Sequence, residues 1–194
     1  MFCEKPVAVD PAGIRSVLAT SKEAAKKNLN IVSGLCWRYE DGVKEIMGRV
    51  MDGAIGEIRS IQTNYLTSTL WHRGREDDDT EMAYQMRNWY YFTWLSGDHY
   101  VEQHVHNLDI MNWVMGAHPV QAISGIGGRQ VRTKEVNGYI YDHFAVEYEY
   151  PGGLRMFSQA RQINGCKNKV EEAIIGTKGE SNCCNWITTK DGDR

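Results

Sequence analysis

The order of the periodic segments is the feature that most constrains the fold. Apolar residues recur at helical spacing over residues 11–28, from about Asp41 to Gly53, and over residues 98–115. Beyond Gly116 the pattern changes to short runs that are typical of strands. The expected strands cover residues 119–130, 139–150, 153–163, 169–176 and 181–189. Helices followed by strands predict an α+β fold, an open and mainly antiparallel sheet with helices on one face.

The remaining segments are less regular. Residues 31–35 are expected to form a short buried strand, and a second strand is expected from Ile58 onward. Residues 70–96 show no clean period, which predicts a long loop with a short helical piece. Long loops inside compact domains are often functional, but an acidic turn beside aromatic residues that fill the core explains the segment equally well.

Charge and cysteine content exclude several classes of protein. The chain has 22 Lys and Arg against 25 Asp and Glu, so no basic surplus indicates binding to nucleic acid or to a membrane surface. No apolar stretch is long enough to span a membrane, and no signal peptide is visible after Met1. Five cysteines, an odd number, favour a reducing and therefore cytoplasmic compartment.

The segment 98–115 carries the candidate chemistry. If it is one continuous helix, His99, Glu102, His106 and Asp109 lie within about 80° of one another on its surface. A histidine beside a carboxylate is a proton-transfer pair, because the carboxylate orients the ring and stabilises its charged form. Trp113 shares this face, which predicts a half-buried pocket wall with Trp113 or residues 70–96 at its rim.

Two other interpretations of this face stay open. The four residues could form a solvated helix surface with incidental ion pairs. They could also bind zinc or manganese, because His99, Glu102, His106 and Asp109 are suitable ligand types. His104 would point about 160° away from His106 and could not join them. We expect no metal site.

The glycine-rich run Gly125–Gly128 does not predict a nucleotide site. A phosphate-binding turn opens a helix whose N-terminus faces the phosphate groups. Here the run lies among expected strands and the GxGxxG pattern is incomplete, so it is interpreted as a glycine-rich strand.

Several short motifs occur in an order that resembles the Gfo/Idh/MocA family, two-domain NAD(P)-dependent oxidoreductases that act mainly on sugars and polyols. In chain order these motifs are Cys3-Glu4-Lys5-Pro6, Gly53-x-x-Gly56, Glu102-x-x-x-His106-x-x-Asp109, Gly116 and Ile175-Gly176-Thr177-x-Gly179. The resemblance extends through nearly the whole chain. It implies that residues 1–35 end a dinucleotide-binding Rossmann domain whose earlier part is missing. Residues 36–194 would then form the substrate-binding and oligomerisation domain.

The resemblance also implies roles for individual residues. Glu4, Lys5 and Pro6 would lie beside the nicotinamide, with Lys5 next to the reacting hydroxyl group. His106 would accept the hydroxyl proton, and Glu102 replaces the aspartate of the family motif, one methylene longer. The expected catalytic residues are therefore Lys5, Glu102 and His106.

Four further residues are expected to contact the substrate. The resemblance suggests Asp109 and Arg38, whereas His99 and Trp113 follow from the helical face described above. The longer protein would use NAD or NADP, but none is expected to bind this chain, which would be inactive alone. The expected partners are a sugar-like small molecule and further copies of the chain.

Two alternatives to a dehydrogenase remain. One is a glycosidase that uses bound NAD transiently, as some members of the family do. The other is a non-catalytic substrate-binding or interaction module. The compartment also stays open, because an exported form would carry its leader ahead of the region that the resemblance implies is missing.

Overall fold

The computed structural model describes residues 1–190 and 192, and it contains two sheets. The small sheet pairs β1 (Phe2–Cys3) with β2 (Val32–Ser33) in parallel. The large sheet has the strand order β4-β5-β6-β3-β7-β8-β9. Its strands are β3 (Ile58–Thr67), β4 (Gln121–Gly128), β5 (His143–Glu149), β6 (Arg155–Gln162), β7 (Lys169–Gly176), β8 (Gly179–Ser181) and β9 (Ile187–Thr189). Neighbours run antiparallel except β3 and β6, which confirms the predicted mainly antiparallel sheet.

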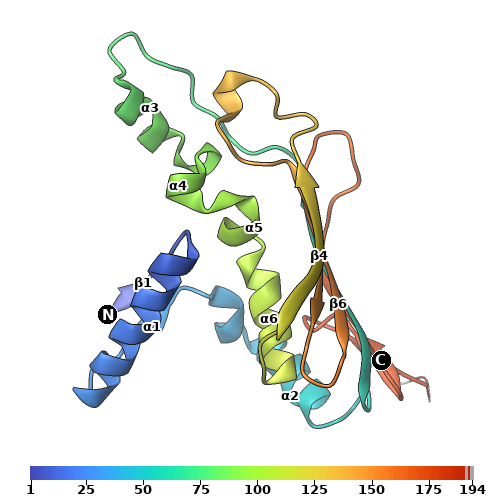
Figure 1. Ribbon diagram of the computed structural model, residues 1–194. Coiled ribbons are helices and arrows are strands. Elements are labelled where there is room, and N and C mark those ends of the chain that lie inside the picture. The colour runs from blue at the N-terminus through green and yellow to red at the C-terminus, as the bar shows by residue number, and fades with distance from the viewer. Residues whose placement is uncertain (191, 193–194) are drawn as a thin grey trace.

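The helices gather on one side of the large sheet (Figure 1). The α-helices are α1 (Pro11–Lys26), α2 (Asp41–Met51), α3 (Glu81–Arg87), α4 (Thr93–Ser96), α5 (Asp98–Glu102) and α6 (Val105–Met115). The 3-10 turns are η1 (Cys36–Tyr39), η2 (Trp89–Tyr91) and η3 (Glu135–Asn137). In Figure 1, α5 and α6 lie between the sheet and α1. None of the described helices is long and apolar enough to cross a membrane.

The main core lies between the large sheet and helices α2 and α6. Alternate residues of a strand face opposite sides of a sheet, so Ile61 of β3, Met156 of β6 and Ile174 of β7 all point toward the helices. They pack against Met47 of α2 and Met111 of α6, both fully buried. This layer fixes α6, and with it the candidate site, against the sheet.

The segment 98–115 is two helices, not one. Helix α5 ends at Glu102 and α6 begins at Val105. The two residues between them both bind β6, because Gln162 Nε2 donates to Gln103 Oε1 at 2.7 Å and His104 Nε2 lies 2.7 Å from Ser158 Oγ. Neighbouring residues of a regular helix point about 100° apart, so binding the same strand through both interrupts the helix. The prediction of a single helix was wrong here.

The N-terminal unit also differs from its prediction. The segment 31–35 was expected to be a buried strand, but only Val32 and Ser33 are extended and the Val32 side chain is 39% exposed. The backbone of this short strand forms hydrogen bonds with β1, and its side chains are not buried in a core. Helix α1 begins as expected at Pro11, where the Asp10 carboxylate accepts a hydrogen bond from Gly13 N at 2.7 Å. The proposed domain boundary near residue 35 stays a prediction.

Residues 70–96 are more helical than predicted. They contain α3, η2 and α4, and their aromatic residues form a second core cluster. The buried members of that cluster are Tyr84, Tyr90, Tyr91, Phe92 and Ile140. The structure therefore supports the interpretation that these aromatic residues fill a core.

The outer face of the large sheet, opposite its helices, exposes several apolar side chains. Ile126 of β4, Phe157 of β6 and Ile175 of β7 are 71%, 49% and 48% exposed. A sheet face with such residues favours contact with another protein surface. We expect the chain to associate through this face, with a mass by light scattering of at least twice the 22.1 kDa of one chain.

Replacing Phe157 with aspartate should shift this assembly toward the single chain, because a charge would be buried in the contact. Val136 lies in η3, outside the sheet face, and is similarly exposed, so Val136→Asp is the matched control. A wild-type mass near that of one chain would contradict the prediction.

Candidate active site

Lys5 and Glu102 meet although they are 97 residues apart in the chain. Lys5 follows β1, and Glu102 is the last residue of α5. Lys5 Nζ donates hydrogen bonds to the Glu102 backbone oxygen at 2.5 Å and to its carboxylate Oε1. Both side chains are largely buried. An ammonium group has three N–H donors, so this geometry leaves one of them for another acceptor.

His106 lies in the first turn of α6 and is half-buried against η1. Its ring centroid is 5.2 Å from that of Trp37. Burial lowers the His106 pKa below its ordinary value of 6.5, and the positive charge of Lys5 lowers it further, against the weaker opposing charges of Glu102 and two other carboxylates. The ring is therefore neutral at neutral pH and able to accept a proton. Its Nδ1 is buried without a hydrogen-bond partner among the described residues.

Arg38 and Asp109 bind each other. Arg38 Nε and Nη2 donate to the two Asp109 carboxylate oxygens at 2.6 and 2.8 Å. The guanidinium group also lies over the Trp113 ring, 5.1 Å from its centroid. These contacts join η1 to α6, and thus hold Trp37 against His106. The structure thus brings Arg38, Asp109 and Trp113 to the predicted region. There the paired N–H donors of Arg38 bind the Asp109 carboxylate.

His99 does not join this group, so the predicted convergence on one helix face was wrong for it. It is buried, its Nδ1 lies 2.8 Å from Asp98 Oδ1, and its ring packs on Phe144 of β5. The four residues share one face only on a continuous helix, and the interruption at Gln103 and His104 changes the relative direction of α5 and α6. In residues 1–190 no three His, Cys, Asp or Glu side chains are grouped as metal ligands would be.

Two tyrosines near Glu102 were missed from the sequence. Tyr65 of β3 has its pKa raised by burial and by the charges of Glu102 and Cys36. Tyr90 accepts a hydrogen bond from Gln162 Nε2 at 2.7 Å, and burial together with the charge of Glu102 raises its pKa. Strand alternation places Tyr65 on the helix-facing side with Ile61, a signal that could have identified it.

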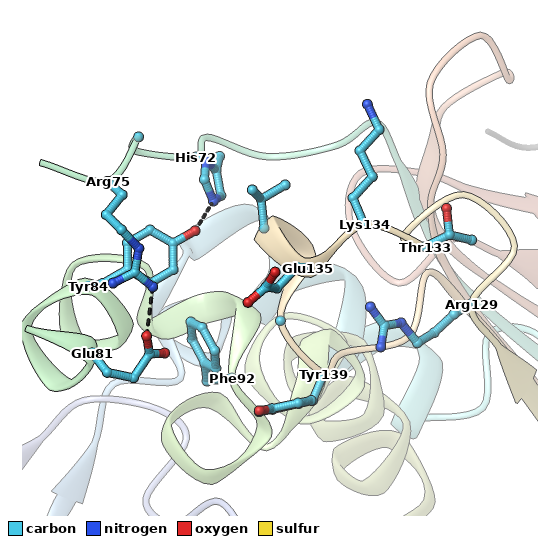
Figure 2. Close-up of a pocket in the computed structure, with 13 residues that line it drawn as sticks. His72, Arg75, Glu81, Tyr84, Phe92, Arg129, Thr133, Lys134, Glu135 and Tyr139 are labelled. Atoms are coloured by element: carbon cyan, nitrogen blue, oxygen red, sulfur yellow. Dashed lines mark hydrogen bonds and ion pairs between the residues drawn. The ribbon is translucent and has the colours of Figure 1, made fainter.

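The segment 70–96 lines a different cavity from the one expected at His106. Its residues His72, Arg75 and Tyr84 form one wall of this cavity, and η3 with the loop around it forms the opposite wall. The cavity has a volume of about 410 Å³. Figure 2 shows Arg75 lying against Tyr84 and directed toward Glu81, with Glu135 entering from the opposite side. This cavity does not support residues 70–96 as the rim of a pocket at His106, although Tyr90 of the segment lies near Glu102; the alternative rim residue, Trp113, lies under the Arg38 guanidinium group.

The described residues fit only the reacting end of a dinucleotide. Lys5 retains a free donor beside the neutral His106 ring, as a hydroxyl group being oxidised requires. A pyrophosphate site is not formed by the residues described, because Gly125–Gly128 lie inside β4, paired with β5. The N-terminus of α1 is capped by the Asp10 carboxylate, which would repel phosphate. Glu4 lies against the Gly34 backbone, and Pro6 follows a cis peptide bond.

Comparison with known proteins gives a consistent result. The model of the GFO/IDH/MocA C-terminal domain matches residues 43–181. A curated relative, 2,7-anhydro-N-acetylneuraminate hydratase of Escherichia coli, is 26% identical over 92% of this chain and 43% of its own length. Trans-1,2-dihydrobenzene-1,2-diol dehydrogenase of Bos taurus is 22% identical over 92% and 46%. The chain thus spans about half the length of these relatives.

Solved structures show the same fold. The WlbA dehydrogenase from Chromobacterium violaceum, solved with NADH and UDP-GlcNAcA, superposes with a TM-score of 0.69 at 18% identity. The match covers 92% of this chain and 47% of that one. With the family model matching most of the chain, the conclusion is direct: this chain belongs to the GFO/IDH/MocA family of oxidoreductases and contains its C-terminal domain.

Proposed function

We propose that these residues belong to an NAD(P)-dependent dehydrogenase of a sugar, a polyol or a related hydroxyl compound. The observation that carries the proposal is the group formed by Lys5, Glu102 and His106, in a chain of an oxidoreductase family. The names of the relatives support the substrate class, since they include a diol dehydrogenase and a dehydrogenase solved with NADH and a sugar nucleotide.

The three residues divide the proton chemistry between them. The neutral His106 ring accepts the proton of the substrate hydroxyl group. The remaining N–H donor of Lys5 binds the same substrate oxygen and stabilises its developing negative charge. Glu102 holds Lys5 in place through its backbone and carboxylate oxygens. The nicotinamide, when bound, supplies the hydride acceptor.

The test is an assay of the gene product that carries these 194 residues, with NAD+ or NADP+ and a panel of sugars, polyols and cyclic diols. Formation of the reduced cofactor, measured by its absorbance, is the expected result. A second candidate follows from the hydratase relative, because the same proton-transfer group would serve an elimination or hydration. Turnover without net formation of reduced cofactor would favour that candidate, and no turnover of any panel member would contradict the dehydrogenase.

The 194-residue chain alone is expected not to bind NADH measurably. Dinucleotide affinity depends on a pyrophosphate site at a helix N-terminus and an acidic residue for the ribose, and the described residues provide neither. Calorimetric titration of the chain with NADH checks this. Binding in the micromolar range would contradict the prediction and require a nucleotide site that the described residues do not suggest.

A further inference from the structure

A second cavity is lined by Trp37, the residue whose ring also packs against His106. It has a volume of about 300 Å³ and is enclosed by η1, α2, α6, β7 and residues 182–185. This volume lies at the lower end of the range that is typical of sites for small ligands. One wall is preformed, because Asn182 Oδ1 accepts hydrogen bonds from the backbone N–H groups of Cys184 and Asn185 at 3.1 and 3.0 Å.

The charged groups that line this cavity are all acidic. Glu40 and Glu172 line it, and Glu171 contributes from the neighbouring position of β7, although its side chain turns to the other face of the sheet; no Lys, Arg or His is among its lining residues. The potential inside is therefore negative and favours a cation. Trp37 adds an aromatic wall, a surface that attracts organic cations. A metal ion is disfavoured, since the described residues contain no group of three suitable ligands.

Glu172 is the unusual member of this lining. It is only 4% exposed, and it lies on the helix-facing side of β7 with the buried Ile174. Asn107 Nδ2 donates to its Oε1 at 2.5 Å. Apart from Asn107 and the residue's own backbone, no described group donates to this carboxyl, and no described cation pairs with it. A buried carboxylate normally has a counter-ion.

Burial raises the Glu172 pKa to about 7, so near neutral pH roughly half of the molecules carry an unpaired negative charge there. A positive ligand group would remove that cost and supply the missing donors. The opposite residue on β3, Thr63, has a buried hydroxyl without a partner in the described region, so it does not compensate the Glu172 charge either.

We propose that this cavity binds the protonated amine of a small molecule, with Glu172 as the counter-charge and Trp37 as the aromatic wall. The proposal goes beyond the dehydrogenase function and does not depend on it. Trp37 also packs against His106, so the amine has two candidate sources. It belongs either to the molecule that reacts at His106 or to a separate amine.

Ligand-observed NMR on the 194-residue chain at about pH 7.5 tests the proposal with four probes, because the Glu172 carboxyl is then mainly ionised while both amine probes are still largely protonated. These are D-glucosamine, N-acetyl-D-glucosamine, D-glucose and ethanolamine. Glucosamine or ethanolamine should bind at least about tenfold more tightly than the two uncharged sugars. Binding of ethanolamine identifies a site for separate amines, whereas binding of glucosamine alone identifies an amine carried by a sugar. Equal binding of charged and uncharged probes, or no binding of either amine, would overturn the proposal.

Variants locate the binding. Glu172→Gln should reduce amine affinity at least about tenfold, while the new side-chain oxygen still accepts the Asn107 hydrogen bond. Trp37→Leu should weaken binding less. Glu57→Gln is the control, since Glu57 is exposed and does not line the cavity. Unchanged amine binding by Glu172→Gln, in a variant whose circular dichroism matches that of the wild type, would also overturn the proposal.

Discussion

Replacing Glu172 with glutamine is expected to stabilise the folded chain more at about pH 8 than near pH 4.5. The change in the free energy of unfolding that the substitution causes should differ by roughly 3 kcal/mol between these two pH values. The carboxyl has an ordinary pKa of 4.5 and a pKa of about 7 when folded. The unfolded chain therefore loses this proton first as pH rises, and the free energy of unfolding falls between these two values. Glutamine does not titrate, so the free energy of unfolding of the variant does not fall in this way as pH rises.

Urea unfolding of wild type and variant at a series of pH values measures the difference. Glu57→Gln is the matched control, because Glu57 is exposed and does not contribute to the raised Glu172 pKa. Its unfolding free energy should follow that of the wild type across the range. The neighbouring charge that acts on Glu172 is that of Glu171, whereas burial raises the pKa of the Cys183 and Cys184 thiols, so both stay neutral over this range. A Glu172→Gln difference that stays constant with pH would contradict the prediction.

Replacing His106 with asparagine is expected to lower kcat/KM by about 10²- to 10⁴-fold in the gene product that carries this chain. Asparagine retains a polar side chain of similar reach but cannot accept and release a proton at neutral pH. Because burial and Lys5 lower the His106 pKa, the wild-type activity should be lost only as pH falls below about 6.5.

The matched control is His118→Asn, since His118 is exposed beyond the end of α6. It should retain wild-type kcat/KM at every pH tested. A His106→Asn variant with the same kcat/KM and the same acid limb as the wild type would show that another group accepts the proton.

The order of elements was predictable because local patterns determine it. Helix α2 ends where expected, with Gly53 at a positive φ of 90°, and α6 ends at Gly116 in the left-handed region. The strands predicted over 119–130, 139–150, 153–163 and 169–176 lie close to those ranges, and Gly125–Gly128 are part of a strand, but the single strand predicted over 181–189 is instead the two short strands β8 and β9. These features depend on residues that are near in sequence.

The interruption between α5 and α6 could not be predicted in this way. Gln103 and His104 are ordinary in a helical pattern, and only their contacts with Gln162 and Ser158 of β6 separate the two helices. Tertiary hydrogen bonds therefore override the local period. The same interruption turns His99 away from His106, which is why the predicted helix face was only partly correct.

The candidate active-site group was predicted by resemblance more than by periodicity. No spacing rule joins Lys5 to Glu102, and the ordered family motifs did so. Glu172 was overlooked, although strand alternation places it on the same face as Ile174, beside buried residues. A carboxylate on the apolar side of a strand is a signal that the sequence contains.

The most direct test of the central claim is an NMR titration of His106 in the 194-residue chain, with its signals identified by their loss in His106→Asn. The account predicts a His106 pKa below 6.5 in the wild type. Lys5→Met should raise it, because the neighbouring positive charge is removed, whereas Lys26→Met, at an exposed site on α1, should leave it unchanged. A pKa at or above 6.5 that does not respond to Lys5→Met would contradict the account.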